Sequence, residues 1–175
     1  REKGEIAMEL KEVLLRRKSC RAYEERPVEK EKLNEVVTAG SLAPLGLPRD
    51  GKPHLTVVTD PAALKMLGGA FGPDNDIIYG APALIVVSCP PSRPGIPEMN
   101  AACVVEMMAL TATDLGLGNI YLYGVTAALA QNEEWKRRLG IPEGHTPLSA
   151  LAVGYAAGEA EVCKEWKATL GENRV

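Results

Sequence analysis

Residues 99–117 read MNAACVVEMMALTATDLGL, and residues 118–124 continue with GNIYLYG. The first stretch is apolar on nearly every side of a helix, although a few polar side chains interrupt it. Those polar groups, and the absence of a flanking basic cluster, favour a helix buried within a protein over a membrane span. Gly116 ends this helix, and the β-branched and aromatic residues after it predict a strand that finishes at Gly124.

Helical and strand patterns alternate on both sides of this unit. Residues 83–88 are continuously apolar, which is typical of a strand buried on both faces. With a length of 175 residues, the chain is predicted to form one α+β domain, a three-layer α/β/α sandwich with a mixed central sheet and a long buried central helix. The charged tail over residues 156–175 is a candidate for wrapping around a partner subunit. Besides the central helix, the expected helices cover residues 5–17, 29–40, 61–67 and 126–139, and the expected strands cover 54–59, 82–88, 119–123 and 148–155.

The composition argues against several classes of protein. A net charge of -3 and a pI near 5.5 argue against a nucleic-acid binder. The four cysteines form no C-x-x-C pair and the two histidines are far apart in sequence, so no metal site is expected. We expect Cys103, within the apolar helix, to be a small buried hydrophobe. The charged N-terminal stretch lacks the apolar core of a secretory signal, so we expect a reduced, cytoplasmic setting.

A basic cluster follows the first expected helix. Arg17, Lys18, Ser19 and Arg21 offer three cations and a hydroxyl, which suit a phosphate. Basic residues at a helix C-terminus also complement the helix dipole without any ligand, so both interpretations stay open on these residues alone. The chain has no P-loop, no G-x-S-x-G and no G-x-G-x-x-G. A phosphate site without a side-chain catalytic constellation indicates that a cofactor carries the reaction.

Five short motifs, in order, resemble those of the nitroreductase family of flavin enzymes. Residues 17–23, RKSCRAY, followed by Pro27 and Val28, resemble the family's opening R-R-S-x-R-x-F/Y run and its P-V pair. Residues 100–118 resemble its long central helix with a G-L-G ending. The other three motifs are Ala43-Pro44 with Lys52-Pro53, Gly80-Ala81-Pro82, and LGIP over residues 139–142 with AVGY over residues 152–155.

The resemblance implies an FMN-dependent oxidoreductase that works as a homodimer, with the flavin at the subunit interface. Hydride would pass from NADH or NADPH through flavin N5 to a nitroaromatic, a quinone or a similar acceptor, in alternating half-reactions. No side chain is expected to act as acid or base. The implied phosphate contacts are Arg17, Lys18, Ser19, Arg21 and Lys164, and the implied contacts along the flavin ring are Pro44, Leu45, Gly46, Leu122, Tyr123 and Gly124.

This chain departs from the family pattern at the ring end of the implied site. Leu45 and Pro48 stand where the pattern has serine and asparagine, and a proline has no side-chain amide for the flavin's pyrimidine edge. Arg49, Asp50 or backbone groups would have to replace those bonds. Asn100 stands where an aspartate is frequent.

Two further interpretations follow from these departures. The stretch between the second expected strand and the central helix, residues 89–98, leaves little chain to cover a substrate, so an open, unselective site is expected. The alternatives to turnover by NAD(P)H are a module that binds a flavin or another phosphate ligand without reaction, and a family branch with different flavin chemistry.

Overall fold

Four strands form one sheet in the order β1-β2-β4-β3 in the computed structural model, which describes residues 8–72, 74–158, 164–167 and 169–173. All three strand pairings are antiparallel. β2 and β3 run in the same direction, but β4 lies between them, so no two neighbouring strands are parallel. The expectation of a mixed sheet was therefore wrong, because the sheet is antiparallel. The described chain has one isolated parallel bridge outside the sheet, between Ser19 and Asn119. The strands are β1 His54–Val58, β2 Ala83–Cys89, β3 Gly118–Leu122 and β4 Thr146–Gly154.

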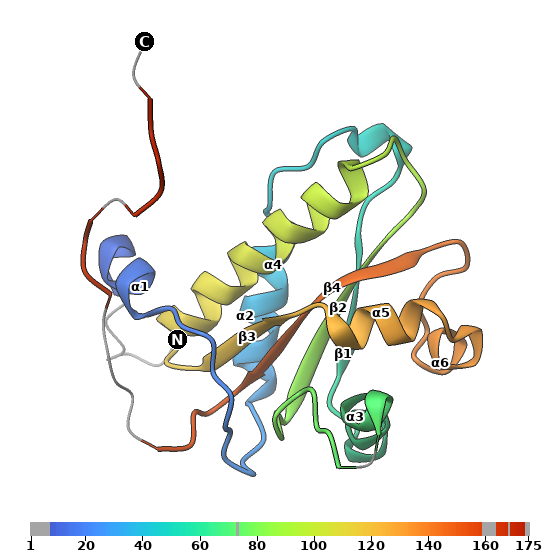
Figure 1. Cartoon of the computed structure of the whole chain (residues 1–175), viewed down its shortest axis with the longest axis horizontal. Coiled ribbons are helices and arrows are strands. Elements are labelled where there is room, and N and C mark those ends of the chain that lie inside the picture. The colour runs from blue at the N-terminus through green and yellow to red at the C-terminus, as the bar shows by residue number, and fades with distance from the viewer. Residues whose placement is uncertain (1–7, 73, 159–163, 168, 174–175) are drawn as a thin grey trace.

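Helices cover both faces of this sheet (Figure 1). α2 and α4 pack on one face against Ile85 and Val87, and α3 and α5 pack on the other against Leu84 and Val86. The side chains of β2 thus alternate between two separate hydrophobic cores, which confirms the α+β class and the three layers. The helices are α1 Leu10–Arg16, α2 Lys30–Ser41, α3 Pro61–Gly68, α4 Ile96–Asp114, α5 Gly124–Ala130 and α6 Glu133–Arg138, and two short 3-10 turns cover Pro48–Asp50 and Gly69–Phe71.

The central helix α4 packs tightly against α2. Gly40 of α2 makes this possible, because a Cβ there would lie only 2.8 Å from Cγ of Met108. α4 starts three residues before the expected position, after Gly95 with φ 84°, and the chain turns away at Gly116 with φ 72°. Cys103 is exposed on the outer side of α4, so its expected burial was wrong.

Two other expectations for the helices need comment. The single helix predicted over residues 126–139 is two helices, α5 and α6, because the side chain of Asn132 caps a new helix by accepting a hydrogen bond from Trp135 N at 3.0 Å. Residues 5–7 of the first predicted helix lie outside the described residues. No helix in the described chain has the length and apolarity that crossing a membrane would require.

Candidate functional site

Residues 17–24, the basic segment, are fastened to the sheet beside β3. Ser19 forms the bridge to Asn119, and Cys20 N donates to Asn119 O at 2.9 Å. Further along, Glu24 N donates to Tyr155 O at 2.9 Å. The basic segment is therefore an extended strand-like piece, and it holds its charged residues next to the start of β3.

The extended geometry divides the predicted phosphate residues between two sides. Successive side chains of an extended chain point to opposite faces. Lys18 and the buried Cys20 line a cavity of about 140 Å³ together with Arg16 and Asn119. Arg17, Ser19 and Arg21 alternate with those two residues and so belong to the other side of the segment. Of the four predicted phosphate contacts in the basic segment, three therefore lie on one side and Lys18 lies on the other.

Lys164 returns to this place from the far end of the chain. Its backbone N donates to Leu15 O at 3.0 Å, and its Nζ donates to Leu14 O at 3.4 Å, which ties it to the C-terminal end of α1. Partial desolvation lowers the pKa of Lys164, and the nearby charge of Arg17 lowers it further, while the carboxylate of Glu106 acts in the opposite direction. Lys164 and Arg17 therefore lie at the same end of α1.

The end of β3 carries exposed aromatic side chains. The ring of Tyr123 is 71% exposed, whereas its carbonyl is fixed by a hydrogen bond of 2.8 Å from Thr126 Oγ1. Phe71, 57% exposed, has its Cε2 3.5 Å from the position of a Cβ on Gly124. Leu122, between the exposed Tyr121 and Tyr123, is buried in the core. Sequence reasoning missed Phe71, and the available signal was that it is the only phenylalanine of the chain.

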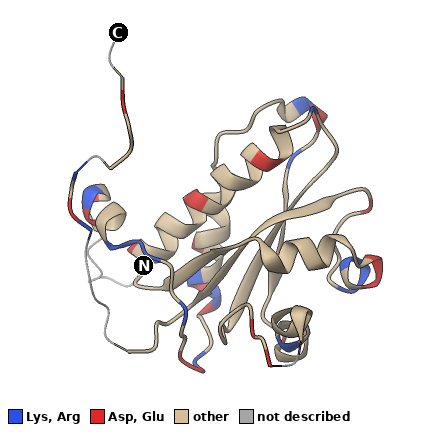
Figure 2. Ribbon diagram, viewed as in Figure 1, with Lys and Arg blue, Asp and Glu red and all other residues tan. Residues whose placement is uncertain are grey.

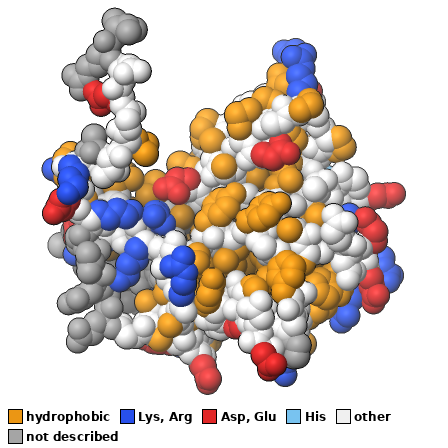
Figure 3. Space-filling view, in the orientation of Figure 1, with side chains coloured by type: hydrophobic (Ala, Val, Ile, Leu, Met, Phe, Trp, Pro, Cys, Tyr) orange, Lys and Arg blue, Asp and Glu red, His pale blue; other side chains and the backbone are white. Residues whose placement is uncertain are grey.

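The cations and the aromatic end of β3 are neighbours. Three residues separate Asn119 from Leu122, which is about 10 Å along a strand. Figure 3 shows Lys and Arg side chains gathered beside α1 and the segment after it, next to a hydrophobic area near α4, β3 and α5, and Figure 2 places those charges on the ribbon. A ligand with an anionic group at one end and a flat apolar group at the other fits this surface.

Residues 44–46 lie at the other end of α4. Asn100, only 8% exposed, holds them: its Oδ1 accepts from Gly46 N at 2.7 Å and its Nδ2 donates to Gly46 O at 3.0 Å. The basic segment instead meets the end of α4 around Thr113. Thirteen residues of helix separate Asn100 from Thr113, which is about 20 Å. Within one chain the structure therefore does not bring residues 44–46 together with the basic segment.

One asparagine that the sequence did not single out supports the start of β3. Asn119 is 2% exposed, and its Nδ2 donates to Ala109 O at 3.1 Å and to Thr113 Oγ1 at 3.0 Å. Its own carbonyl accepts the hydrogen bond from Cys20 N. Asn119 thereby joins the end of α4, β3 and the basic segment.

The two histidines, far apart in sequence, meet at the other end of the sheet. The ring centroids of His54 and His145 are 6.3 Å apart, and Ser88 Oγ lies 3.4 Å from His145 Nδ1. Desolvation lowers the pKa of His145, and the charge of His54 lowers it further, against a raising contribution from a hydrogen bond with Ser88. Over the described residues, no three His, Cys, Asp or Glu side chains are grouped so that they could hold a metal ion.

The fold is an α+β sandwich in which exposed cations lie beside an aromatic surface. Comparison with known proteins shows what the chain is similar to. The nitroreductase family model matches residues 72–155. Solved structures of nitroreductases with bound FMN are similar over nearly the whole chain. The one from Bacteroides fragilis has a TM-score of 0.81 and 28% identity, covering 96% of this chain and 98% of that one. The one from Desulfitobacterium hafniense has a TM-score of 0.77 and 26% identity, covering 94% and 100%.

Two curated archaeal proteins, named provisionally as NADH dehydrogenase/NAD(P)H nitroreductases, are also similar. The Archaeoglobus fulgidus protein is 29% identical over 83% of this chain and 84% of its own length. The Methanothermobacter thermautotrophicus protein is 29% identical over 86% of this chain and 78% of its own. The chain is thus similar to nitroreductases in the family model and in both archaeal relatives, in agreement with the resemblance of its motifs.

Proposed function

We propose that this protein is an FMN-dependent oxidoreductase that takes hydride from NADH or NADPH and passes it to an oxidised acceptor such as a nitroaromatic or a quinone. The FMN in similar structures and the names of the archaeal relatives support the class. The observation in this chain that carries the proposal is the attachment of Lys164, through hydrogen bonds to Leu14 O and Leu15 O, to the end of α1 that Arg17 caps.

The anchoring end of the site fits the phosphate of FMN. Arg17 and Lys164 carry like charges at the same end of α1, and a dianion between them would form charge-assisted hydrogen bonds with both. Ser19 and Arg21, exposed on the same side of the basic segment as Arg17, add a hydroxyl and a third cation. Lys18, on the opposite side, contributes to the positive field and makes no direct contact in this proposal.

The ring end is formed by the chain after β3. Phe71 and Tyr123 present aromatic faces that would keep water from one side of a flat ring. The backbone of Tyr123 is fixed by Thr126, so the peptide groups of residues 122–124 are held in place for the ring. Bound FMN supplies the hydride chemistry, and the chain supplies position and electrostatics. No side chain is assigned as acid or base.

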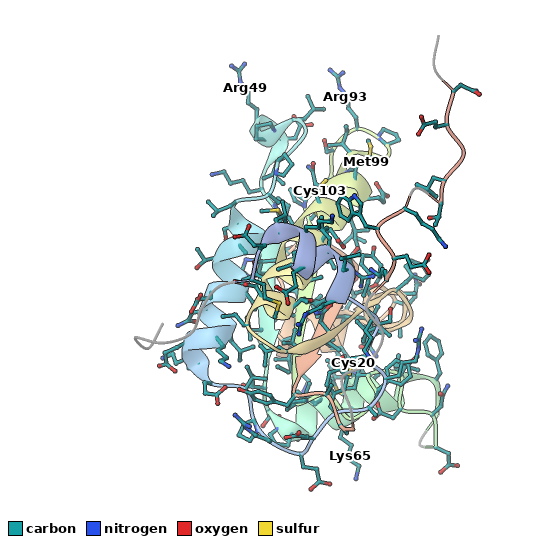
Figure 4. The ribbon with its side chains drawn as sticks, turned by 90° about the vertical axis from the view of Figure 1, so that its left-hand side faces the viewer. Cys20, Arg49, Lys65, Arg93, Met99 and Cys103 are labelled. Atoms are coloured by element: carbon teal, nitrogen blue, oxygen red, sulfur yellow. The ribbon has the colours of Figure 1, made fainter. Side chains whose placement is uncertain are left out.

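A homodimer completes this site. Residues 44–46 lie about 20 Å along α4 from the basic segment, so they can approach the same ligand only from a second copy. A twofold dimer that packs α4 against α4 in antiparallel directions would bring the start of one helix to the end of the other. The outer side of α4 carries the exposed Met99 and Cys103, which Figure 4 labels near its start. Light scattering should give twice the chain mass.

The polar contacts to the pyrimidine edge of the flavin remain part of the proposal. Leu45 and Pro48 offer no amide, and the Arg49 side chain extends away from the ribbon (Figure 4), so backbone groups take that role. Asp50, the other candidate, already accepts a hydrogen bond from Ser92 Oγ at 2.5 Å. The wrapping of residues 156–175 around the partner and the cytoplasmic setting stay predictions, and residues 159–163, 168 and 174–175 of this tail lie outside the described chain.

The visible spectrum of the purified protein tests the proposed function. A yellow protein whose flavin absorption is bleached by NADH or NADPH, and restored by a nitroaromatic or a quinone, is the expected result. Protein that takes up no flavin after incubation with FMN would overturn the assignment. Protein that binds FMN but is not reduced by either nucleotide would instead support the second candidate, a binding module without turnover, which Leu45 and Pro48 favour.

A further inference from the structure

Arg49 and Arg93 project from two adjoining loops at one end of the molecule (Figure 4). Figure 4 shows their side chains extending in the same direction, away from the ribbon, with Lys65 at the opposite end. Both are exposed, and neither forms a salt bridge with any residue in the described part of the chain. Two exposed guanidinium groups without a salt-bridge partner are suited to bind phosphate oxygens.

The two loops that carry these arginines are held together. Ser92 Oγ donates to Asp50 Oδ2 at 2.5 Å, which joins the residues next to the two arginines and occupies the nearest carboxylate in sequence. Gly51 packs closely on Pro90, because a Cβ on Gly51 would lie 2.6 Å from Pro90 Cγ. The two loops that carry the arginines are therefore in direct contact, which keeps the backbones of Arg49 and Arg93 near each other.

The position of Arg49 relates the pair to the proposed active site. Arg49 follows Gly46 by three residues, and Gly46 is fixed to α4 by both polar atoms of the Asn100 amide. Residues 44–46 are the part of the chain proposed to lie along the flavin ring of the partner subunit. The loop over residues 89–98 is short, so it leaves the space beside Arg93 open to a long substrate.

We propose that Arg49 and Arg93 bind a phosphate group of the nicotinamide dinucleotide while its nicotinamide ring lies on the flavin. This inference rests on the proposed function. The nicotinamide end must reach the flavin, so the diphosphate and the phosphorylated ribose extend outward, past residues 44–46 toward the two arginines. The common chemistry is a phosphate, which belongs either to the diphosphate of both nucleotides or to the 2′-phosphate of NADPH alone.

Steady-state kinetics of the full chain loaded with FMN test this assignment. The double variant R49Q/R93Q should raise KM for the nucleotide about tenfold, since two exposed charge-assisted contacts are lost, and should leave kcat nearly unchanged. A rise for NADPH alone assigns the 2′-phosphate, and an equal rise for NADH and NADPH assigns the diphosphate. The phosphate-free hydride donor 1-benzyl-1,4-dihydronicotinamide should react with unchanged KM.

The matched control is K65Q/R137Q, which also removes two exposed positive charges but leaves Arg49 and Arg93 in place. It should leave KM for both nucleotides unchanged. Unaltered KM values in R49Q/R93Q, or an equal rise in the control, would overturn the assignment while the flavin spectrum leaves the proposed function standing. Calorimetric titration with NADP+ measures binding without turnover. Weaker binding to R49Q/R93Q than to wild type supports phosphate binding by the two arginines, and equal binding contradicts it.

Discussion

Replacing Asn100 with aspartate should destabilise the protein in a pH-dependent way. The Asn100 amide uses both of its polar atoms on Gly46, accepting at 2.7 Å and donating at 3.0 Å. An ionised aspartate keeps the first bond, cannot donate the second, and places a buried negative charge against the Gly46 carbonyl oxygen. Leaving a carbonyl without its donor costs about 1–3 kcal/mol. Because Gly46 is exposed and the helix dipole favours an acid near the start of α4, we expect about 1–2 kcal/mol at pH 7.

The pH dependence identifies the cause. Burial and the facing carbonyl raise the folded-state pKa of the new carboxyl above about 3.9, its value in the unfolded chain. Once protonated, the carboxyl of the N100D variant can again donate to Gly46 O, so the penalty is absent below the unfolded pKa and grows as the pH rises through the folded one. In a chain of this size the loss at pH 7 corresponds to a fall in Tm of about 3–6 °C.

Urea unfolding and thermal melts between pH 4 and pH 8 measure this effect. N34D, on the exposed side of α2, is the matched control because it makes the same chemical change without a buried partner. It should follow wild type across the pH range. A penalty for N100D that stays constant with pH, or a Tm equal to that of wild type at pH 7, would refute the two-bond role of Asn100.

Three other predictions test the fold and the site. G154A should lose about 1–3 kcal/mol in urea unfolding, because its Cβ would lie 2.5 Å from a proline carbon, whereas G69A, with nothing within 4 Å, should be near wild type. R17Q should weaken FMN binding about 5–30-fold in fluorescence titration and K18Q less than threefold, and equal losses would contradict the two-sided basic segment. Hydrogen bonding from Tyr155 lowers the pKa of Glu29 to about 2, so wild type should lose stability as the pH falls from about 4.5 toward that value, and E29Q should lack this component of its acid unfolding curve.

The sequence was sufficient to predict those helices and strands whose residue pattern is compatible with only one structure. The continuous apolar run of β2 is possible only where both faces are buried, and the two cores on either side of Ile85 satisfy it. Asn132 had two solutions, since an asparagine can continue a helix at modest cost or cap a new one. In the structure Asn132 caps a new helix, because its side-chain oxygen accepts a hydrogen bond from Trp135 N. Cys103 shows the same limit, because an apolar helix does not reveal which of its sides a second copy would cover.

The sequence predicted the members of the basic segment but not their directions. A motif lists Arg17, Lys18 and Arg21 as neighbours, whereas an extended backbone sends alternate side chains to opposite sides. The burial of Cys20 determines which side each residue of the segment faces. Cys20 packs so closely on Gly118 that a Cβ on Gly118 would lie 2.9 Å from the Cys20 sulfur. Phe71 had no motif at all, and only the packing of the segment after α3 beside Gly124 placed it at the end of β3.

The length of α4 explains why the site could not be completed from one chain. A family motif can state that residues 44–46 and the basic segment serve one cofactor, but it carries no information on which subunit provides each. Asn100 fixes the first to the start of α4, and Asn119 fixes the second to its end. With about 20 Å of rigid helix between these two contacts, no local rearrangement brings them together. The same two asparagines that order each half-site therefore make cofactor binding in the proposed site a property of the dimer.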